Sequence, residues 1–409
     1  MSSEGPLSDL TVVEMTVHRA GPFCGALLAD LGAEVIKIER PGVGDPARGQ
    51  GPGPAGKSGY FMANNRNKKS VTLDLKTEAG REAAIDLLAD ADVFVENFGY
   101  GVAEKLGIGY EDVSAVNEDV VYASIKGYGE TGPDREKKGL DLILQAEGGI
   151  MSVTGPEGGD PVKVGQAIGD LTAGMFATIA ILARLHERDE RDGTEGTDEG
   201  EFVGKFDVSL FDAIVSVMNE YLTFDSMTGE VPGPQGTSHQ SIVPYQLFET
   251  ADGHVVTGVP SDERWDDFVD VVGREELREY PTNDDRVANE ETVTAMIQEE
   301  FAKRSTEHWL SALTERGFPT GPLNDVGDVV DHDQARVRGL VREHDDPDAG
   351  EVVLPGHPVH FPDFETEIRQ PVPRLGEHTD EVFAGVVGDQ TTLDEWRADG
   401  AFGGDRGDA

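Results

Sequence analysis

Short apolar runs alternate with longer amphipathic segments over the first half of the chain. The runs are rich in Val and Ile, which is typical of strands buried in a sheet. They predict strands at 11–15, 34–39, 92–96 and 120–125. The segments between and after them predict helices at 23–31, 78–90, 140–149 and 170–187. Strands that alternate with helices favour an α/β fold whose parallel sheet is covered on both faces.

The pattern changes in the second half of the chain. The charged segment 186–201 has almost no apolar residue, which predicts a solvated connector. A Gly- and Pro-rich stretch at 225–240 marks a boundary, and further turn-rich segments follow after residue 330. The remaining elements are predicted as a strand at 202–206, a helix at 208–218, a hairpin over 245–257 and helical segments at 262–272 and 291–316.

The chain is strongly acidic. It carries 79 acidic and 34 basic residues, a formal net charge of −45. Because a nucleic-acid binder needs a basic surface that displaces counterions, this charge argues against nucleic acid as a partner. The carboxylates are spread along the whole chain, which predicts a surface adapted to a cytoplasm near salt saturation, where charges are screened. The persistent apolar patterning excludes a wholly disordered chain.

Neither a membrane segment nor an export signal is predicted. No run of about 18 apolar residues occurs, and the N-terminus lacks the basic start and apolar stretch of a signal peptide. We therefore expect a cytoplasmic protein without membrane contact. The single cysteine, Cys24, excludes a disulfide within the chain, and its apolar neighbours predict burial. The segment Gly51–Ser58 matches the letters of a P-loop, but its prolines and the lack of a preceding strand indicate a surface loop.

Ordered segments along the chain carry a more specific signal than any generic motif. In order, they are AGP at 20–22, LADLGAEVIKIERP at 28–41, NRNKKS at 65–70, DLK at 74–76, DVFVENF at 92–98, GYGETGP at 127–133, GDLTAG at 169–174, DVSL at 207–210, PYQLF at 244–248, ADG at 251–253 and RLGEHT at 374–379. Their order and spacing span nearly the whole chain. Together they resemble the family III CoA-transferases, which include formyl-CoA:oxalate and carnitine CoA-transferases and α-methylacyl-CoA racemase.

This resemblance implies an architecture and a set of partners. A Rossmann-like large domain would form from residues 1–224 and from a C-terminal segment, 331–409, that returns to it. A smaller α+β domain with its linkers would comprise residues 225–330. Two chains would interlock as a homodimer. The implied substrates are an acyl-CoA and a small carboxylic acid, with CoA as part of the substrate and with neither a metal nor a tightly bound cofactor.

The resemblance assigns the catalytic nucleophile to Asp170, at the start of a long apolar helix. A carboxylate can conserve the free energy of a thioester, because it attacks the thioester carbonyl and forms an acyl anhydride. A helix N-terminus favours the ionised carboxylate, and its free N–H groups offer an oxyanion site. Gly169 is expected to leave room for the thioester. The alternative is that Asp170 only caps the helix.

Substrate-binding residues are also assigned by their positions in the motifs. The phosphates of CoA need cations even on an acidic protein, although a solvated basic side chain is the alternative for each candidate. The candidates for CoA are Arg40, Leu73, Lys76, Lys105, Leu106 and Lys138, with the two leucines placed beside adenine. The candidates for the carboxylic acid are His18, Arg19, Ala20 and His239. Arg19 is suited to bind the distal carboxylate of a dicarboxylic acid with two hydrogen bonds.

These residues favour succinyl-CoA as the donor and a C4–C5 dicarboxylate such as mesaconate as the acceptor. Other dicarboxylates, a carnitine-like acid and an aromatic acid are alternatives. The racemase branch needs two opposed acid/base groups, commonly a His followed by an Asp. Here Leu140 precedes Asp141, and because leucine carries no proton to transfer, a racemase is disfavoured. A non-enzymatic CoA-binding protein, in which Asp170 would be dispensable, is the remaining alternative.

Overall fold

The chain forms two compact units in the computed structural model, which describes residues 5–54, 57–192 and 202–403. The large unit comprises residues 1–150, 164–220 and 333–409, and the small unit comprises residues 151–163 and 221–332. The small unit thus includes residues 151–163, which the sequence analysis placed in the large domain. Residues 55–56 of the P-loop-like segment and residues 193–201 of the predicted connector lie outside the described residues.

A six-stranded sheet forms the centre of the large unit. Its strands are β1 (Thr11–Met15), β2 (Glu34–Glu39), β3 (Lys68–Thr72), β4 (Val93–Glu96), β5 (Val121–Lys126) and β6 (Phe206–Ser209). They lie in the order β3-β2-β1-β4-β5-β6, and every neighbouring pair is parallel. This is the strand order of a doubly wound fold, so the predicted α/β class with a Rossmann-like sheet is confirmed.

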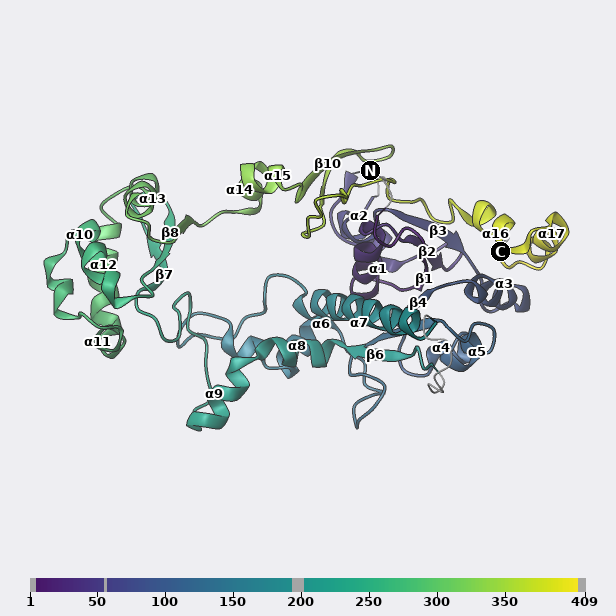
Figure 1. Cartoon of the computed structure of the whole chain (residues 1–409), viewed down its shortest axis with the longest axis horizontal. Helices are drawn as coiled ribbons and strands as arrows, with labels where there is room; N and C mark the ends of the chain where they lie inside the picture. The colour runs from purple at the N-terminus through teal and green to yellow at the C-terminus, as the bar shows by residue number, and fades with distance from the viewer. Residues whose placement is uncertain (1–4, 55–56, 193–201, 404–409) are drawn as a thin grey trace. The chain divides into compact units, whose positions relative to one another are not determined.

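One face of the sheet is covered by four helices. They are α1 (Ala20–Asp30), α6 (Asp141–Glu147), α7 (Ile168–Asp192) and α8 (Leu210–Met218). Figure 1 shows α7 lying beside α1, and the inner side of α7 packs in the same core as Val12 of β1. The buried Cys24 of α1 also lies in this core, as predicted, and burial raises the pKa of its thiol to about 12.

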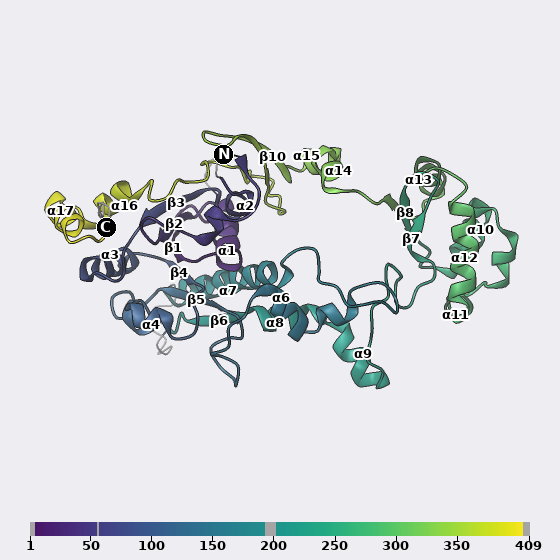
Figure 2. The ribbon, with the colours of Figure 1, turned by 180° about the vertical axis from the view of Figure 1, so that it is seen from behind.

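The opposite face of the sheet is covered from both ends of the chain. Successive strand residues point to opposite faces, so Val13 packs on this side whereas Val12 packs on the other. The helices here are α3 (Glu78–Ala89), α4 (Val102–Leu106), α5 (Tyr110–Ser114), α16 (Thr379–Val387) and α17 (Gln390–Ala398). Figure 2 shows α16 and α17 beside α3. The large unit also contains α2 (Gly59–Asn65), α15 (Asp333–Val337) and the hairpin of β10 (Val341–Asp346) and β11 (Gly350–Pro355).

Helix α7 is long and apolar enough to span a membrane by length and composition. The sequence contains no unbroken apolar run of this length, because charged residues dominate the C-terminal part of this helix. The most apolar window is 44% buried. Its buried side, which includes Ala173, Ala177 and Ile181, belongs to the core under the sheet.

The small unit is built on a short antiparallel sheet. Its strands are β7 (Tyr245–Glu249), β8 (His254–Gly258) and β9 (Thr320–Pro322). The helices are α9 (Glu220–Thr228), α10 (Trp265–Val272), α11 (Asn283–Ala288), α12 (Glu290–Phe301), α13 (Thr306–Glu315) and α14 (Val326–Asp331). Aromatic side chains dominate its core, where the rings of Phe301 and Trp309 stack with centroids 4.2 Å apart.

Candidate active site

Three of the four residues assigned to the carboxylic acid, His18, Arg19 and Ala20, follow β1 at the switch point of the large sheet. Here β1 and β4 are neighbours whose connections run to opposite sides, which opens a crevice at their carboxyl ends. The turn after β1 contains His18 and Arg19. Asn97, just beyond β4, holds this turn with two hydrogen bonds: the Val17 N–H donates to its Oδ1 at 2.9 Å, and its Nδ2 donates to the Val17 carbonyl at 2.8 Å.

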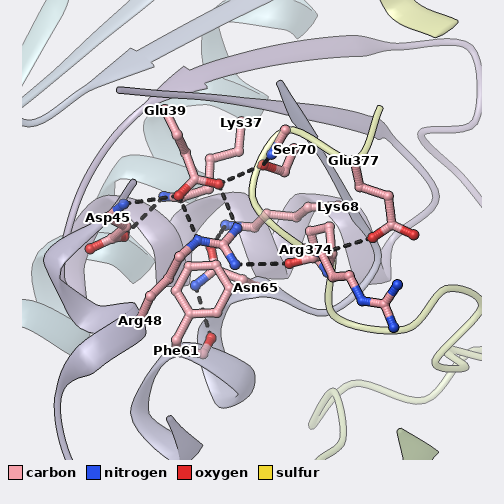
Figure 3. A network of polar contacts seen from close by, with 12 residues as sticks. Lys37, Glu39, Asp45, Arg48, Phe61, Asn65, Lys68, Ser70, Arg374 and Glu377 are labelled. Atoms are coloured by element: carbon pink, nitrogen blue, oxygen red, sulfur yellow. Dashed lines mark hydrogen bonds and ion pairs between the residues drawn. The ribbon is translucent and has the colours of Figure 1, made fainter. Parts of the chain in front are cut away.

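A buried ion pair holds the same turn from the side of β2. His18 has a φ of 65°, a left-handed conformation that is uncommon outside glycine. Its N–H donates to Asp45 Oδ1 at 3.0 Å, and Asp45 pairs with the fully buried Lys37 at 3.1 Å. Lys37 Nζ also donates to the carbonyl of Thr16 at 2.7 Å. These charged groups therefore fix the backbone that precedes Arg19, and Figure 3 shows the pair of Lys37 and Asp45.

A second polar cluster fastens the C-terminal segment to the end of β2. The buried carboxylate of Glu39 accepts hydrogen bonds from Arg48 and Ser70, each at 2.6 Å. Arg48 also donates to the carbonyl of Pro373 at 3.0 Å, and the N–H of Gly376 donates to Ser70 Oγ at 3.0 Å (Figure 3). The RLGEHT segment thus supports the strand end that precedes Arg40.

Four of the six residues assigned to CoA line one pocket at the ends of β1, β2 and β3. They are Arg40, Leu73, Lys76 and Leu106. Arg40 and Lys76 are exposed, whereas Leu73 is buried. Phe98 lines the same pocket and was missed by the sequence analysis, although it belongs to the DVFVENF segment. Apolar walls suit an adenine ring, and two cations suit the phosphates on the ribose attached to it.

The other two residues assigned to CoA do not line that pocket. Lys105 lies on α4 beside Leu106, and its side chain is exposed. Lys138 is exposed in the segment that follows β5. A second, open pocket adjoins the first one and shares Arg40 and Lys76 with it, and its far wall comes from the end of α17 and from Phe402.

Asp170 lies in the first turn of α7, and the carboxylate of Asp141 caps this turn. Asp141 Oδ1 accepts hydrogen bonds from the N–H groups of Gly169 at 2.8 Å and of Asp170 at 3.4 Å. A Cβ atom on Gly169 would lie 2.8 Å from Ile214 and 3.1 Å from Asp141. The missing side chain therefore leaves room for these two residues. This differs from the expected room for a thioester.

The predicted ionising effect of the helix N-terminus is outweighed at Asp170. Burial raises the pKa of its carboxyl to about 7, the charge of Asp141 adds to the rise, and Arg19 opposes it. In addition, the N–H groups of Gly169 and Asp170 donate to Asp141 and not to the Asp170 carboxylate. Asp170 therefore exchanges its proton near neutral pH, as candidate catalytic groups commonly do.

Arg19 faces the same part of the crevice. Its Nη1 donates to Gln166 Oε1 at 3.1 Å, and its Cζ lies 4.4 Å from the ring centre of Tyr60. Burial raises the pKa of the Tyr60 phenol, Arg19 lowers it, and the charge of Asp170 raises it further, so all three groups interact. Tyr60 and Gln166 were missed, because neither stands in a segment that carries the resemblance.

Small residues allow α1 and α7 to cross closely beside the site. Ala20, assigned to the acid site, is the first residue of α1 and is buried. A side chain on Gly174 would come within 2.7 Å of the Ala20 carbonyl oxygen. His18 is exposed, whereas His239 belongs to the small unit, where its ring stacks on Tyr245 with centroids 5.2 Å apart.

Comparison with known proteins gives consistent matches over nearly the whole chain. Residues 7–379 match the family described as "CoA-transferase family III". The human succinyl-CoA:glutarate CoA-transferase is 36% identical over 95% of this chain and 87% of its own length. The succinyl-CoA:mesaconate CoA-transferase of Haloarcula hispanica is 38% identical over 93% and 97%. A crystal structure of a CAIB/BAIF family protein from Brucella suis has a TM-score of 0.82 and 35% identity, covering 94% of this chain and 100% of that one.

Proposed function

The chain belongs to CoA-transferase family III, and from this premise we propose that it moves CoA from succinyl-CoA to a C4–C5 dicarboxylic acid such as mesaconate, with Asp170 as the nucleophile. The observation that carries the proposal is the placement of Arg19 beside Asp170 at the switch point of the sheet. A cation at that position suits an acid with a second carboxylate. The names of the two relatives agree on succinyl-CoA and differ in the acceptor, glutarate or mesaconate.

The proposed chemistry has two symmetrical halves. The Asp170 carboxylate attacks the thioester carbonyl of succinyl-CoA, which forms a mixed anhydride and releases CoA thiolate. The thiolate attacks the aspartyl carbonyl, so that succinate leaves and an aspartyl-CoA thioester remains. The acceptor carboxylate attacks this thioester, which gives a new anhydride and CoA thiolate. The thiolate then attacks the acyl carbonyl, and the new acyl-CoA leaves with Asp170 restored as a carboxylate. No atom is oxidised or reduced.

The CoA moiety is proposed to occupy the pocket lined by Leu73 and Leu106. Arg40 and Lys76 lie at the same pocket and are assigned to its phosphates. Lys105 and Lys138 remain proposed contacts for the outer part of CoA, since both are exposed.

His18, Arg19, Ala20 and His239 are proposed to bind the carboxylic acid. The exposed His18 is held by Asp45 in a fixed turn, and Ala20 begins the helix behind it. His239 is proposed as a contact from the small domain.

We also propose that the active particle is an interlocked homodimer. Exposed apolar side chains on α7, namely Met175, Phe176 and Ile179, favour a protein partner. Light scattering at high salt decides between a dimer and a monomer.

An exchange assay tests the proposed function. Succinyl-CoA is offered with mesaconate, glutarate, citramalate, carnitine and an aromatic acid in about 3 M KCl, where surface charges are screened, and new thioesters are identified by mass spectrometry. We expect a new acyl-CoA from one or more dicarboxylates and none from carnitine or the aromatic acid. Transfer to carnitine or the aromatic acid alone would contradict the proposed acceptor class.

A further inference from the structure

The guanidinium of Arg19 is held by two neighbouring side chains. Nη1 donates to Gln166 Oε1 at 3.1 Å, and Cζ lies 4.4 Å from the centre of the Tyr60 ring. Nε is buried and has no hydrogen-bond partner among the described residues. A buried donor without a partner is unfavourable, so Arg19 keeps this orientation through its contacts with Gln166 and Tyr60.

Both groups that hold Arg19 are neutral. The amide of Gln166 accepts a hydrogen bond without cancelling the positive charge, and the ring of Tyr60 offers an aromatic face. Within the described residues, Arg19 makes no ion pair. A glutamate at position 166 would instead bind the guanidinium with its own carboxylate and compete with a substrate. The two groups that hold Arg19 therefore leave its charge uncancelled, and this charge acts on Asp170.

The position of Gln166 is itself fixed from α6. The fully buried Gln145 donates from Nε2 to the carbonyl of Gln166 at 3.2 Å and to Asp141 Oδ2 at 2.7 Å. Its Oε1 accepts from the N–H of Val164 at 2.9 Å. The loop that carries Gln166 is thus tied to the same helix that caps the first turn of α7 at Asp170.

We propose that Gln166 and Tyr60 are positioning residues that hold the Arg19 guanidinium where it binds the distal carboxylate of the acceptor, and that they so set the preference for dicarboxylic over monocarboxylic acids. A charge-assisted hydrogen bond from the guanidinium to that carboxylate would supply the preference. This inference rests on the proposed function, because it requires an acceptor with a second carboxylate.

A competition experiment tests this inference. Glutarate and valerate, which have five carbons each, compete for CoA from succinyl-CoA in one reaction, and the ratio of the two products is measured. Because both acids react with the same enzyme-bound CoA, effects of a substitution on the donor cancel. The variants are Gln166→Ala, Tyr60→Leu, Tyr60→Phe, Arg19→Met and the double variant R19M/Q166A, with Gln390→Ala on the exposed surface of α17 as the control.

We expect the wild type to prefer glutarate and Q166A and Y60L to lower that preference about tenfold, the range of a lost orienting contact to a charged group. Y60F retains the aromatic face and keeps the preference within about twofold. In R19M the preference is largely lost, and adding Q166A changes nothing further. The inference is overturned if Q166A and Y60L leave the wild-type preference unchanged, or if Q166A acts equally in the R19M background. A wild type that does not prefer glutarate refutes the proposed function as well.

Discussion

At the scale of single residues, the proposed chemistry depends on a carboxylate whose surroundings oppose its charge. Burial and Asp141 raise the pKa of Asp170 to about 7, and Arg19 only partly compensates. A carboxylate destabilised in this way is a stronger nucleophile once it is ionised, because it is less stabilised by its surroundings. Asp141 therefore has two effects: its hydrogen bonds to α7 position Asp170, and its charge raises the pKa.

The first prediction concerns the pH dependence of this carboxylate. Asp170 reacts only when it is ionised, so kcat/KM for succinyl-CoA should rise with pH through about 7 and fall below it. Asp141→Asn removes one negative charge but retains an oxygen that can cap α7. It should move the midpoint to lower pH by about one unit. The measurement is the pH profile of kcat/KM.

A control variant on the same helix is Asp189→Asn. Asp189 is exposed near the far end of α7, so its substitution should leave the midpoint in place. An unchanged midpoint in D141N, or an equal shift in D189N, would show that Asp141 does not set the pKa of Asp170.

A site residue could be predicted from the sequence only if it stands in or beside a segment that carries the family resemblance. Asp170 and Arg19 stand in or beside segments that carry the family resemblance, so the sequence indicated them. Gln166 contacts Arg19 from 147 positions away, and this proximity arises only when α7 packs on α1. Local patterns contain no information about such a contact.

At the scale of elements, apolar periodicity located most strands and helices of the large unit. The charged segment 186–192, however, is the last part of α7 and not a connector. Its charges pair at helical spacing or with the sheet: Arg184 bonds Glu187 at 2.5 Å, and Arg188 pairs with Asp92 at 3.1 Å. Lack of apolar residues indicated exposure correctly, but exposure does not exclude a helix.

Two other differences have equally local causes. The helical segment predicted at 291–316 is two helices, because Ser305 caps a new helix with a hydrogen bond from the His308 N–H. The sixth strand lies at 206–209 and not at the predicted 202–206. Residues 206–209 pair with β5 from Ala123 to Lys126. Strand pairing decided that register, and the apolar pattern could not.

At the scale of the whole molecule, the excess of acidic residues lies on the surface. Each buried carboxylate in the described residues has a basic partner, as in the pairs Glu14–Lys68, Asp30–Arg66 and Glu96–Lys126. Buried charges therefore nearly cancel. The net charge of −45 therefore arises from exposed carboxylates, which repel one another across the surface.

The second prediction is that the fold requires salt. At about 1 M salt the Debye length is near 3 Å, and at about 0.01 M it is near 30 Å, so only concentrated salt screens the exterior. We expect the thermal unfolding midpoint, followed by circular dichroism, to fall steeply as KCl is diluted. Sucrose, which strengthens apolar burial but does not screen charge, should restore the midpoint less than KCl does. A midpoint independent of KCl would refute a salt-adapted surface.

The most direct test of the central proposal is intact-protein mass spectrometry after incubation with succinyl-CoA and rapid quenching in acid. We predict a covalent adduct with the mass of CoA less one water, located by peptide mapping at Asp170. Asp170→Asn should give no adduct and no transfer while it still binds CoA, and Asp189→Asn should behave like the wild type. An adduct at another residue, or CoA transfer by Asp170→Ala, would contradict a covalent mechanism through Asp170.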